Sequence, residues 1–432
     1  MTPTVYIKDL KDHVGQTVTV RGWLYQKRSS GKIKFAILRD GTGYLQGVLA
    51  TGEATDQAMA DFERLTQESS FTMSGSVRED KRAPGGFEMT VKELTLVQVA
   101  QEYPIHPKEH GAAFLMDNRH LWLRSSRQHA IMRVRNEIVM AIRQFFYERD
   151  FVLIDTPILT GAIGESAQTL FETEYFDLGK AYLAQTGQLY VEAACMAHGR
   201  VYCFGPTFRA EKSKTRKHLN EFWMIEPEVA FNDSDANMQL QEEFVCFIVK
   251  WVLERCQVEL KALERDTSKL EKVTPPFPRI SYDEAIARLQ KAGMPIPYGV
   301  DFGAPDEEQL MEEFEKPLFV YNWPTAIKAF YMKRNPERPD LVLCDDLLGP
   351  EGYGELIGGS QREDDLDLLL ERIQAQKLPV ESYEWYLDLR RYGSVPHAGF
   401  GLGLERTVAW ICGLDHVRET IPFARTLGRL YP

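Results

Sequence analysis

The chain has 432 residues, enough for two or three domains and a sizeable hydrophobic core. Its hydrophobic content of 44% and charged content of 26% are typical of globular proteins, and its net charge of -12 argues against non-specific nucleic-acid binding, which favours basic chains. No CxxC pair, apolar signal core or run of about 18 apolar residues occurs, so we expect a cytoplasmic protein with reduced cysteines and no membrane contact.

Residues 1–102 are expected to form a small β-barrel. Apolar and polar residues alternate in TVTVRGWLYQKR, IKFAILRD and YLQGVLA, and the segments SSGK and GTG between them predict turns. The segments FTMSGSVRE and FEMTVKELTLVQVA then flank a Pro-Gly-Gly turn. Strands of this length and spacing favour a closed barrel of the OB type, with a small β-sandwich as the alternative.

The rest of the chain is expected to combine strands and helices. Residues 103–128 are rich in Pro, His and charge, which predicts a linker, and a second domain should span 129–432 with a helical segment near 232–296. Apolar spacing predicts helices over 126–150 and from Ser234, as cap, to 264. FVLIDTPILT predicts a buried strand with Pro157 as a breaker, and VPHAGFGLGLERTVAWICG predicts a glycine-rich strand that runs into a helix.

The stretch TFRAEKSKTRKHLNEF concentrates charge in an otherwise acidic chain. Arg209 and Glu211 are two residues apart on a predicted strand, so their side chains should face the same side. The basic residues that follow, as far as His218, can close over a polyphosphate through charge-assisted hydrogen bonds. Phe222 can stack on a purine. The alternative is a solvated basic hairpin.

Two glycine-rich segments supply further candidates. In CDDLLGPEGYGELIGGSQRE, Asp346 and Glu355 are hard oxygen ligands suited to Mg²⁺, unless they are merely solvated, and Arg362 can meet a substrate oxygen. In GFGLGLERTVAW the alternating glycines, ending at Gly403, leave one strand face bare for a flat ring. Arg406 can cover that ring by a cation–π contact, although a tightly packed strand–helix crossing is the alternative.

These segments together indicate an ATP site without a P-loop, because neither GxGxxG nor a Walker A motif is present. The order LIDTP, FRAE…RKHLNEF and GLGLER resembles the three motifs of class II aminoacyl-tRNA synthetases. VRGWLYQKRSSGKIKFAILRDGTGYLQ resembles the OB-type anticodon-binding domain of their aspartyl, asparaginyl and lysyl subgroup. EFWMIEPE, IKAFYM, ELIGGSQRE and WYLDLRRYGSVPHAGFGLGLER are similar to the asparaginyl family, so the resemblance covers essentially the whole chain.

The resemblance implies an α+β fold in which an OB-type barrel precedes an antiparallel sheet flanked by helices. It also implies a homodimeric ligase that uses ATP and Mg²⁺ to join L-asparagine to tRNA(Asn). The implied ATP-binding residues are Arg209, Glu211, His218, Phe222, Glu355, Gly403 and Arg406. Arg209 would hold the α-phosphate and the amino-acid carboxylate, Glu211 the adenine amino group, and Asp346 with Glu355 the Mg²⁺.

Further roles that the resemblance implies concern the amino acid and the dimer. Glu165, in GESAQTLF, matches the family's glutamate for the α-ammonium group, although this chain has Ser166 and Ala167 where the family has glycine. Gln188 would line the amino-acid pocket. Pro157 would lie at a two-fold dimer interface.

The choice between asparagine and aspartate can be argued from charge. Aspartyl enzymes that resemble this chain have Lys after QLY, where this chain has Val191, and Asp where it has Glu226. We hypothesise that Glu226 accepts a hydrogen bond from the asparagine amide nitrogen while Arg362 donates to the amide oxygen. Aspartate would then place two carboxylates against each other. The alternative is that Glu226 pairs with a neighbouring arginine.

The anticodon residues and the competing functions are also set by the resemblance. Phe35 can stack on an unpaired base, or belong to the barrel core, and Arg28 and Gln46 match positions that read the central uridine.

The rivals are an aspartyl-tRNA synthetase charging both tRNAs, an asparagine synthetase that amidates aspartate, and an OB-fold binding protein with an inactive synthetase domain. Val191 and Glu226 oppose the first, the barrel opposes the second, and an intact catalytic set opposes the third.

Overall fold

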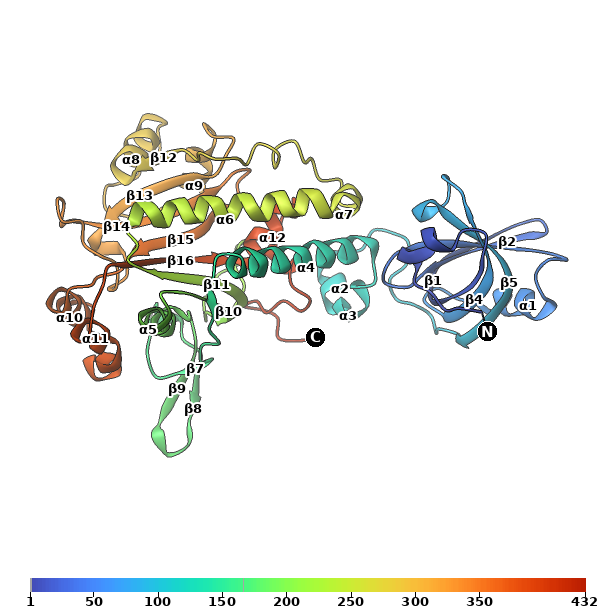
Figure 1. Ribbon diagram of the computed structural model, residues 1–432, viewed down its shortest axis with the longest axis horizontal. Helices are drawn as coiled ribbons and strands as arrows, with labels where there is room; N and C mark the ends of the chain where they lie inside the picture. Colours follow the sequence, from blue (N-terminus) through green and yellow to red (C-terminus); the bar gives the residue numbers. More distant parts are fainter. Residues whose placement is uncertain (1, 166) are drawn as a thin grey trace. The chain divides into compact units, whose positions relative to one another are not determined.

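The computed structural model describes residues 2–165 and 167–432. The chain divides into two compact units, Met1–Leu115 and Met116–Pro432, which are described separately (Figure 1). Within the described residues, no helix has both the length and the apolar character needed to cross a membrane.

The first unit is a closed five-stranded barrel, in which hydrogen-bonded neighbours follow the order β1-β2-β3-β5-β4. Its strands are β1 (Thr17–Ser30), β2 (Ile33–Arg39), β3 (Tyr44–Ala50), β4 (Ser70–Glu79) and β5 (Phe87–Gln98). The barrel prediction is confirmed, because alternate apolar residues such as Val18, Val20 and Leu38 fill the core. The helices η1 (Ile7–His13) and α1 (Asp56–Arg64) were not predicted. Thr55 caps α1, and Phe62 on α1 packs into the barrel core.

The second unit is built on an eight-stranded sheet with the order β12-β13-β14-β15-β16-β11-β10-β6. Only the edge pairs β12–β13 and β10–β6 are parallel, so the predicted antiparallel sheet flanked by helices is confirmed in its centre. The strands are β6 (Val152–Leu153), β10 (Arg200–Phe208), β11 (Glu221–Ala230), β12 (Arg279–Ser281), β13 (Leu318–Pro324), β14 (Leu341–Gly349), β15 (Gly354–Gln361) and β16 (His397–Gly403). A separate small sheet holds β7 (Leu159–Thr160), β8 (Glu172–Glu174) and β9 (Lys180–Leu183).

Helices pack along one face of the large sheet, and Figure 1 shows α4 and α6 running beside its strands. Ile138 of α4 and Phe244 of α6 share one apolar core with sheet residues such as Ile357 and Phe400. The α-helices of this unit are α2 (Ala112–Asp117), which begins just before it, α3 (Arg119–Trp122), α4 (Ser126–Tyr147), α5 (Gln188–His198), α6 (Ser234–Arg255), α7 (Gln257–Ala262), α8 (Tyr282–Lys291), α9 (Ala304–Met311), α10 (Leu366–Ala375), α11 (Glu384–Arg391) and α12 (Leu404–Cys412). The predicted strand-to-helix passage is β16 followed by α12.

Three local predictions were wrong. The helix expected over 234–264 breaks at Cys256 into α6 and α7, and its cap is Asp233, whose side chain accepts from Ala236 N, rather than Ser234. FVLIDTPILT forms two short strands, β6 and β7, interrupted around Pro157 as expected, but Val152 and Leu153 of β6 are exposed rather than buried. Pro157 lies between them and has no backbone N–H to donate to a sheet.

The segment expected to be a linker contains helical structure at its C-terminal end. Helices α2 and α3 form there, and Arg119 on α3 is 1% exposed. Its guanidinium donates to the carbonyl oxygens of Glu419, Ile421 and Pro422. Those bonds join residues about 300 positions apart, which local composition could not indicate.

Candidate active site

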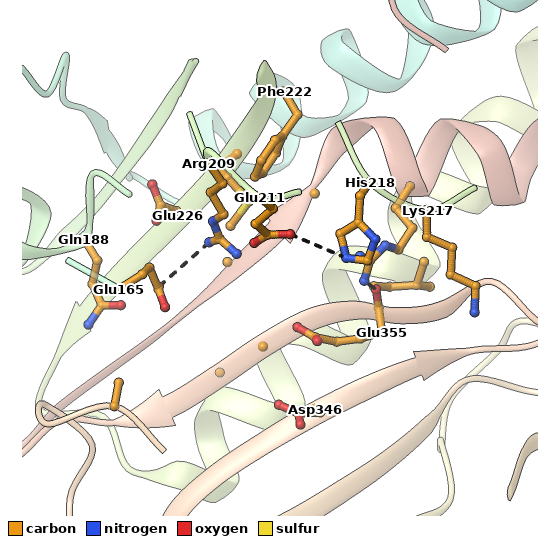
Figure 2. Close-up of a pocket in the computed structure, with 18 of the residues that line it drawn as sticks. Glu165, Gln188, Arg209, Glu211, Lys217, His218, Phe222, Glu226, Asp346 and Glu355 are labelled. Carbon is orange, nitrogen blue, oxygen red and sulfur yellow. Dashed lines mark hydrogen bonds and ion pairs between the residues drawn. The ribbon is translucent and has the colours of Figure 1, made fainter. Parts of the chain in front are cut away.

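One cavity of about 410 Å³ opens on the second unit, on the sheet face opposite α6. Successive side chains of β14 face opposite faces of the sheet, so Leu347 belongs to the helix-covered core while Asp346 lines the cavity. The cavity brings together all the candidate residues for ATP, the amino acid and Mg²⁺: Glu165, Gln188, Arg209, Glu211, His218, Phe222, Glu226, Asp346, Glu355, Arg362, Gly403 and Arg406. Figure 2 labels all of these except Arg362, Gly403 and Arg406. Residues distant in the sequence therefore form one site.

Arg209 lies at the centre of this site. The strand β10 ends at Phe208, so the prediction that Arg209 and Glu211 lie on a strand was wrong. Asn220 instead holds the loop, because its side-chain amide donates to the carbonyl oxygens of Arg209 and Glu211 at 2.8 and 3.0 Å. Arg209 Nη2 lies 3.8 Å from Glu165 Oε1, and the guanidinium lies 5.4 Å from the centre of the Phe222 ring. A cation is thus held beside an aromatic face.

The basic loop covers the other end of the cavity. His218 Nε2 lies 3.9 Å from Glu211 Oε2, and its Nδ1 contacts the hydroxyl of Thr215. Burial lowers the pKa of His218, and the nearby Arg406 lowers it further, while Glu211 opposes the shift. Lys217 reaches the α9 carboxylates of Glu307 and Glu308 at 3.6 and 3.8 Å. The loop therefore presents positive charge while two acidic residues anchor it.

The carboxylate of Glu226 is held by donors at the inner end of the cavity. Gly187 N donates to Oε2 at 2.8 Å, Cys203 Sγ lies 3.2 Å from the same oxygen, and the Thr186 hydroxyl donates to Oε1. The side chain is 6% exposed. None of its described hydrogen-bond partners is an arginine. These contacts therefore do not support the alternative in which Glu226 pairs with a neighbouring arginine.

Arg362 is fixed by a different carboxylate, Glu228. Nε and Nη2 of Arg362 donate to the two Glu228 oxygens at 3.0 and 2.8 Å, and Nη1 donates to Ser360 Oγ at 2.8 Å. The Arg362 and Glu228 side chains are 4% and 1% exposed. This fork-to-fork geometry fixes the guanidinium plane and leaves further N–H donors for a ligand.

The glycines in the two glycine-rich strands serve different purposes. A Cβ on Gly403 would meet nothing within 4 Å, so this position is bare, as predicted from the alternating pattern. A Cβ on Gly399 would lie 2.1 Å from Glu228 Oε2, so that glycine makes room for a protein side chain rather than a ligand. A Cβ on Gly359 would likewise meet Gln241 of α6 at 2.5 Å.

Asp346 and Glu355 converge on one point of the cavity wall. A Cβ on Gly358 would lie 3.0 Å from Glu355 Oε1 and 3.8 Å from Asp346 Oδ1. Lys328 Nζ donates to Asp346 Oδ2 at 2.8 Å. Burial raises the pKa of Asp346 to about 7, with Lys328 opposing and Glu355 adding to the shift. Two carboxylates on a bare backbone cradle fit a hard divalent cation that also takes phosphate oxygens and water.

Several residues in or beside the cavity had no specific role in the sequence interpretation. Tyr331 donates its hydroxyl to Glu165 Oε1 at 3.4 Å, and its ring lies 5.5 Å from the Arg362 guanidinium carbon. Lys328 and Tyr331 belong to the quoted segment IKAFYM, and Glu228 lies two residues after Glu226 on β11. The spacing of two along one strand was the signal that could have indicated a role for Glu228.

The remaining candidates lie outside this cavity. On the barrel, Arg28 of β1 pairs with Phe35 of β2, and its guanidinium lies 4.0 Å from the Phe35 ring centre. Phe35 is half-buried and points away from the core, so its assignment to the barrel core was the wrong alternative. Gln46 of β3 donates to Glu88 at 2.6 Å. Pro157 is exposed, and Ser166 lies outside the described residues.

Comparison with known proteins decides the family. Residues 111–427 match the family described as tRNA synthetases class II (D, K and N), and residues 18–97 match the OB-fold nucleic acid binding domain. The chain belongs to the class II tRNA synthetases. This family match confirms the resemblance drawn from the motifs, and the barrel match confirms the OB-type fold of the first unit.

Full-length relatives refine the comparison. The chain is 57% identical to the asparagine–tRNA ligase of Chloroflexus aurantiacus over 100% of both chains, and 60% identical to that of Desulforamulus reducens over 99% of both. Among solved structures, asparaginyl-tRNA synthetase from Pyrococcus horikoshii, complexed with asparaginyl-adenylate, superposes with a TM-score of 0.96 at 46% identity over 100% of both chains. Aspartyl-tRNA synthetase from Entamoeba histolytica gives 0.84 at 26% identity, covering 100% of this chain and 93% of that one.

Proposed function

We propose that this class II synthetase is an asparagine–tRNA ligase, which activates L-asparagine with ATP and transfers it to the 3′ end of tRNA(Asn). The observation that carries the proposal is the single cavity in which Arg209, Arg406, Glu226 and Arg362 meet. The full-length asparagine–tRNA ligase relatives favour this activity over the aspartyl and asparagine-synthetase alternatives. The Pyrococcus structure holds asparaginyl-adenylate, a product of ATP use.

The first step joins the asparagine carboxylate to the α-phosphate of ATP, and pyrophosphate leaves. Arg209 would hold both reacting groups, because its guanidinium lies between Glu165 and Phe222 at the centre of the cavity. Arg406 and His218 would hold the departing phosphates, and Phe222 would stack on adenine. No side chain has to transfer a proton, so positioning and charge neutralisation supply the rate enhancement. In the second step the terminal ribose hydroxyl of tRNA attacks the adenylate.

Asparagine would be recognised at its two ends. Glu165 and Gln188 would accept hydrogen bonds from its α-ammonium group, and Arg362 would donate to its amide oxygen. Glu226 would accept from the amide nitrogen, since its two oxygens accept only three described hydrogen bonds. Aspartate would bring a carboxylate against Glu226 in a poorly solvated pocket, which disfavours it.

Mg²⁺ and the oligomeric state extend the proposal. Asp346 and Glu355 would hold Mg²⁺, which when bound neutralises charge on the phosphates. A homodimer would bury the surface around Pro157, where Val152 and Leu153 of β6 are 41% and 37% exposed. Arg28, Phe35 and Gln46 would contact the anticodon on the outer face of the barrel. A cytoplasmic location remains a prediction.

Aminoacylation tests this function. Purified protein, ATP, Mg²⁺ and labelled asparagine are incubated with a tRNA transcript carrying the asparagine anticodon. We expect label on the intact transcript and none on a transcript with a periodate-oxidised 3′ end, which lacks the accepting hydroxyl. Absence of label on the intact transcript would reject the ligase function.

A further inference from the structure

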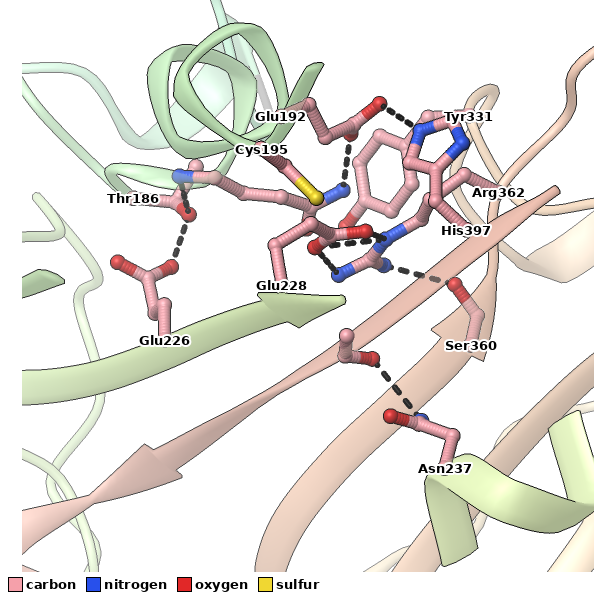
Figure 3. A network of polar contacts seen from close by, with 12 residues as sticks. Thr186, Glu192, Cys195, Glu226, Glu228, Asn237, Tyr331, Ser360, Arg362 and His397 are labelled. Carbon is pink, nitrogen blue, oxygen red and sulfur yellow. Dashed lines mark hydrogen bonds and ion pairs between the residues drawn. The ribbon is translucent and has the colours of Figure 1, made fainter. Parts of the chain in front are cut away.

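A buried carboxylate lies behind the amino-acid end of the cavity. Glu192 of α5 is not among the described residues that line the cavity, and its side chain is 0% exposed. Its neighbours Arg390 and His397 are also 0% exposed. Figure 3 shows Glu192 facing His397, with the Arg362–Glu228 pair alongside. The proposed reaction gives this charged group no part.

Every described polar contact of Glu192 comes from a hydrogen-bond donor. Tyr386 Oη lies 2.8 and 2.7 Å from the two carboxylate oxygens, and Arg390 Nη2 lies 2.9 Å from Oε2. His397 Nε2 lies 3.0 Å from Oε2, and Gln188 Nε2 donates to Oε1 at 3.1 Å. Burial opposes ionisation, but Arg390 and His397 outweigh it and hold the pKa of Glu192 well below its usual range. Glu192 is therefore a carboxylate that only accepts.

This arrangement settles which way the Gln188 amide points. An amide beside an ionised carboxylate must present its NH₂ group to it, because the carboxylate has no proton to donate. The Gln188 carbonyl oxygen is then the end left for the cavity, and Figure 2 shows Gln188 beside Glu165 at the cavity wall. An α-ammonium group carries only donors, so it needs acceptors there. If the Gln188 amide were reversed, its N–H groups would face the N–H donors of the α-ammonium group, and no hydrogen bond could form between them.

We propose that Glu192 is a positioning residue for amino-acid binding: it fixes the Gln188 amide so that Oε1 accepts a hydrogen bond from the α-ammonium group of asparagine. The inference rests on the proposed function and adds a residue outside the cavity to it. Residues 188 and 192 lie one helical turn apart on α5, so the helix itself sets their contact.

A merely structural role for Glu192 would have a different consequence. The carbonyl oxygen of His397 accepts from Arg362 N at 2.9 Å, so a general collapse of the buried cluster would also disturb Arg362 at the amide end. The two roles separate if the α-ammonium group can be removed from the ligand. Succinamate is asparagine without its α-amino group, and it keeps both the carboxylate and the side-chain amide.

The test measures ATP–pyrophosphate exchange by the full-length protein and its Glu192→Gln variant. Three constants are compared: KM for asparagine, the inhibition constant of succinamate against asparagine, and KM for ATP. We expect Glu192→Gln to raise KM for asparagine about tenfold or more, because the Gln188 amide is no longer held in place and its hydrogen bond with the charged α-ammonium group is lost. The other two constants should change less than about twofold, since neither ligand uses the Gln188 oxygen.

A matched control is Tyr386→Phe, which removes one donor to Glu192 but keeps its charge and its contact with Gln188. It should leave the ratio of the asparagine and succinamate constants unchanged. Equal weakening of both ligands by Glu192→Gln, or no weakening of asparagine, would overturn the inference. If Glu192→Gln does not fold, Glu192→Asp, which withdraws the carboxylate by one methylene, should show the same selective loss. Failure of the wild-type protein to exchange with asparagine would instead reject the proposed function.

Discussion

Lys328 donates to Oδ2 of Asp346 at 2.8 Å, and the other oxygen, Oδ1, faces the point where Glu355 converges. The lysine is 13% exposed, so the pair is largely withdrawn from water. Lys328 thus fixes one oxygen and leaves the other for a ligand. A cation site of this kind needs both carboxylates, because each supplies a single oxygen toward the shared point.

The first prediction concerns that cation. Asp346→Asn should lower asparagine-dependent pyrophosphate exchange about 100-fold and raise the Mg²⁺ concentration needed for half-maximal rate, because a neutral amide binds Mg²⁺ weakly. Exchange measured over a Mg²⁺ titration checks this. Asp301→Asn is the control, since Asp301 also lines the cavity, 3.9 Å from Lys328, but is 69% exposed. An unchanged Mg²⁺ requirement in Asp346→Asn would contradict the site.

The second prediction concerns the buried pair of Arg362 and Glu228. Glu228→Gln should lower the free energy of unfolding by about 3 kcal/mol, because it leaves a buried guanidinium without its charged partner. It should also raise KM for asparagine more than KM for ATP. Urea unfolding and exchange kinetics measure the two effects. Glu384→Gln, in an exposed pair with Arg391, should cost less than about 1 kcal/mol. Equal costs at both positions would count against the buried geometry.

The third prediction concerns the barrel. Phe35→Ala should raise KM for tRNA about tenfold or more, because stacking on a base contributes about 1–3 kcal/mol. It should leave pyrophosphate exchange without tRNA unchanged, since Phe35 lies outside the cavity. Aminoacylation at varied tRNA concentration checks this. Tyr6→Ala, which removes another aromatic of the same unit that is 59% exposed, should have little effect on tRNA. A tRNA effect no larger for Phe35 than for Tyr6 would remove Phe35 from the proposed anticodon surface.

The fourth prediction concerns pH and His416. Nδ1 of this half-buried side chain accepts from Arg418 N at 3.1 Å, which requires the unprotonated nitrogen. Burial, with help from Arg418 and Arg216 and against the opposing effect of Glu419, lowers the pKa of His416 to about 4. The folded state thus disfavours protonation of His416. The stability that the neutral His416 side chain contributes is therefore present above about pH 6.5 and is lost as pH falls toward about 4.

Comparison with His416→Asn isolates this contribution. Between about pH 7 and about pH 5, the wild-type free energy of unfolding should fall more than that of the variant, by about 1 kcal/mol or less because water screens a half-buried group. Urea unfolding at both pH values measures the difference. A wild-type protein that gains stability relative to the variant on acidification would refute the assignment.

The sequence predicts which residues form the site, but it predicts their backbone conformation only where the signal is local. Arg406 lies at the start of the expected helix, because glycine spacing followed by helical periodicity is a local signal. Arg209 and Glu211 reach the same cavity from a loop instead of a strand. Their positions depend on Asn220, a contact across the hairpin that no periodicity encodes.

The buried partners of the site were beyond sequence reasoning for a related reason. Glu192 meets Arg390, and Arg362 meets Glu228, over separations of 198 and 134 residues. Composition suggests that such charges are solvated, and only the fold shows that they are withdrawn from water. The break in the helix at Cys256 has the same origin, since tertiary packing overrides local preference. The split of FVLIDTPILT differs, because Pro157 between the two short strands is a local signal.

Amide recognition by Glu226 is the central claim, and ATP–pyrophosphate exchange with Mg²⁺, comparing asparagine with aspartate, tests it most directly. The wild-type protein should exchange with asparagine, and kcat/KM for aspartate should be lower by a factor of about 10⁴. Glu226→Gln should reduce the difference in kcat/KM between asparagine and aspartate, because it removes the carboxylate that repels the aspartate side chain. Exchange driven equally by aspartate and asparagine in the wild-type protein would contradict the account.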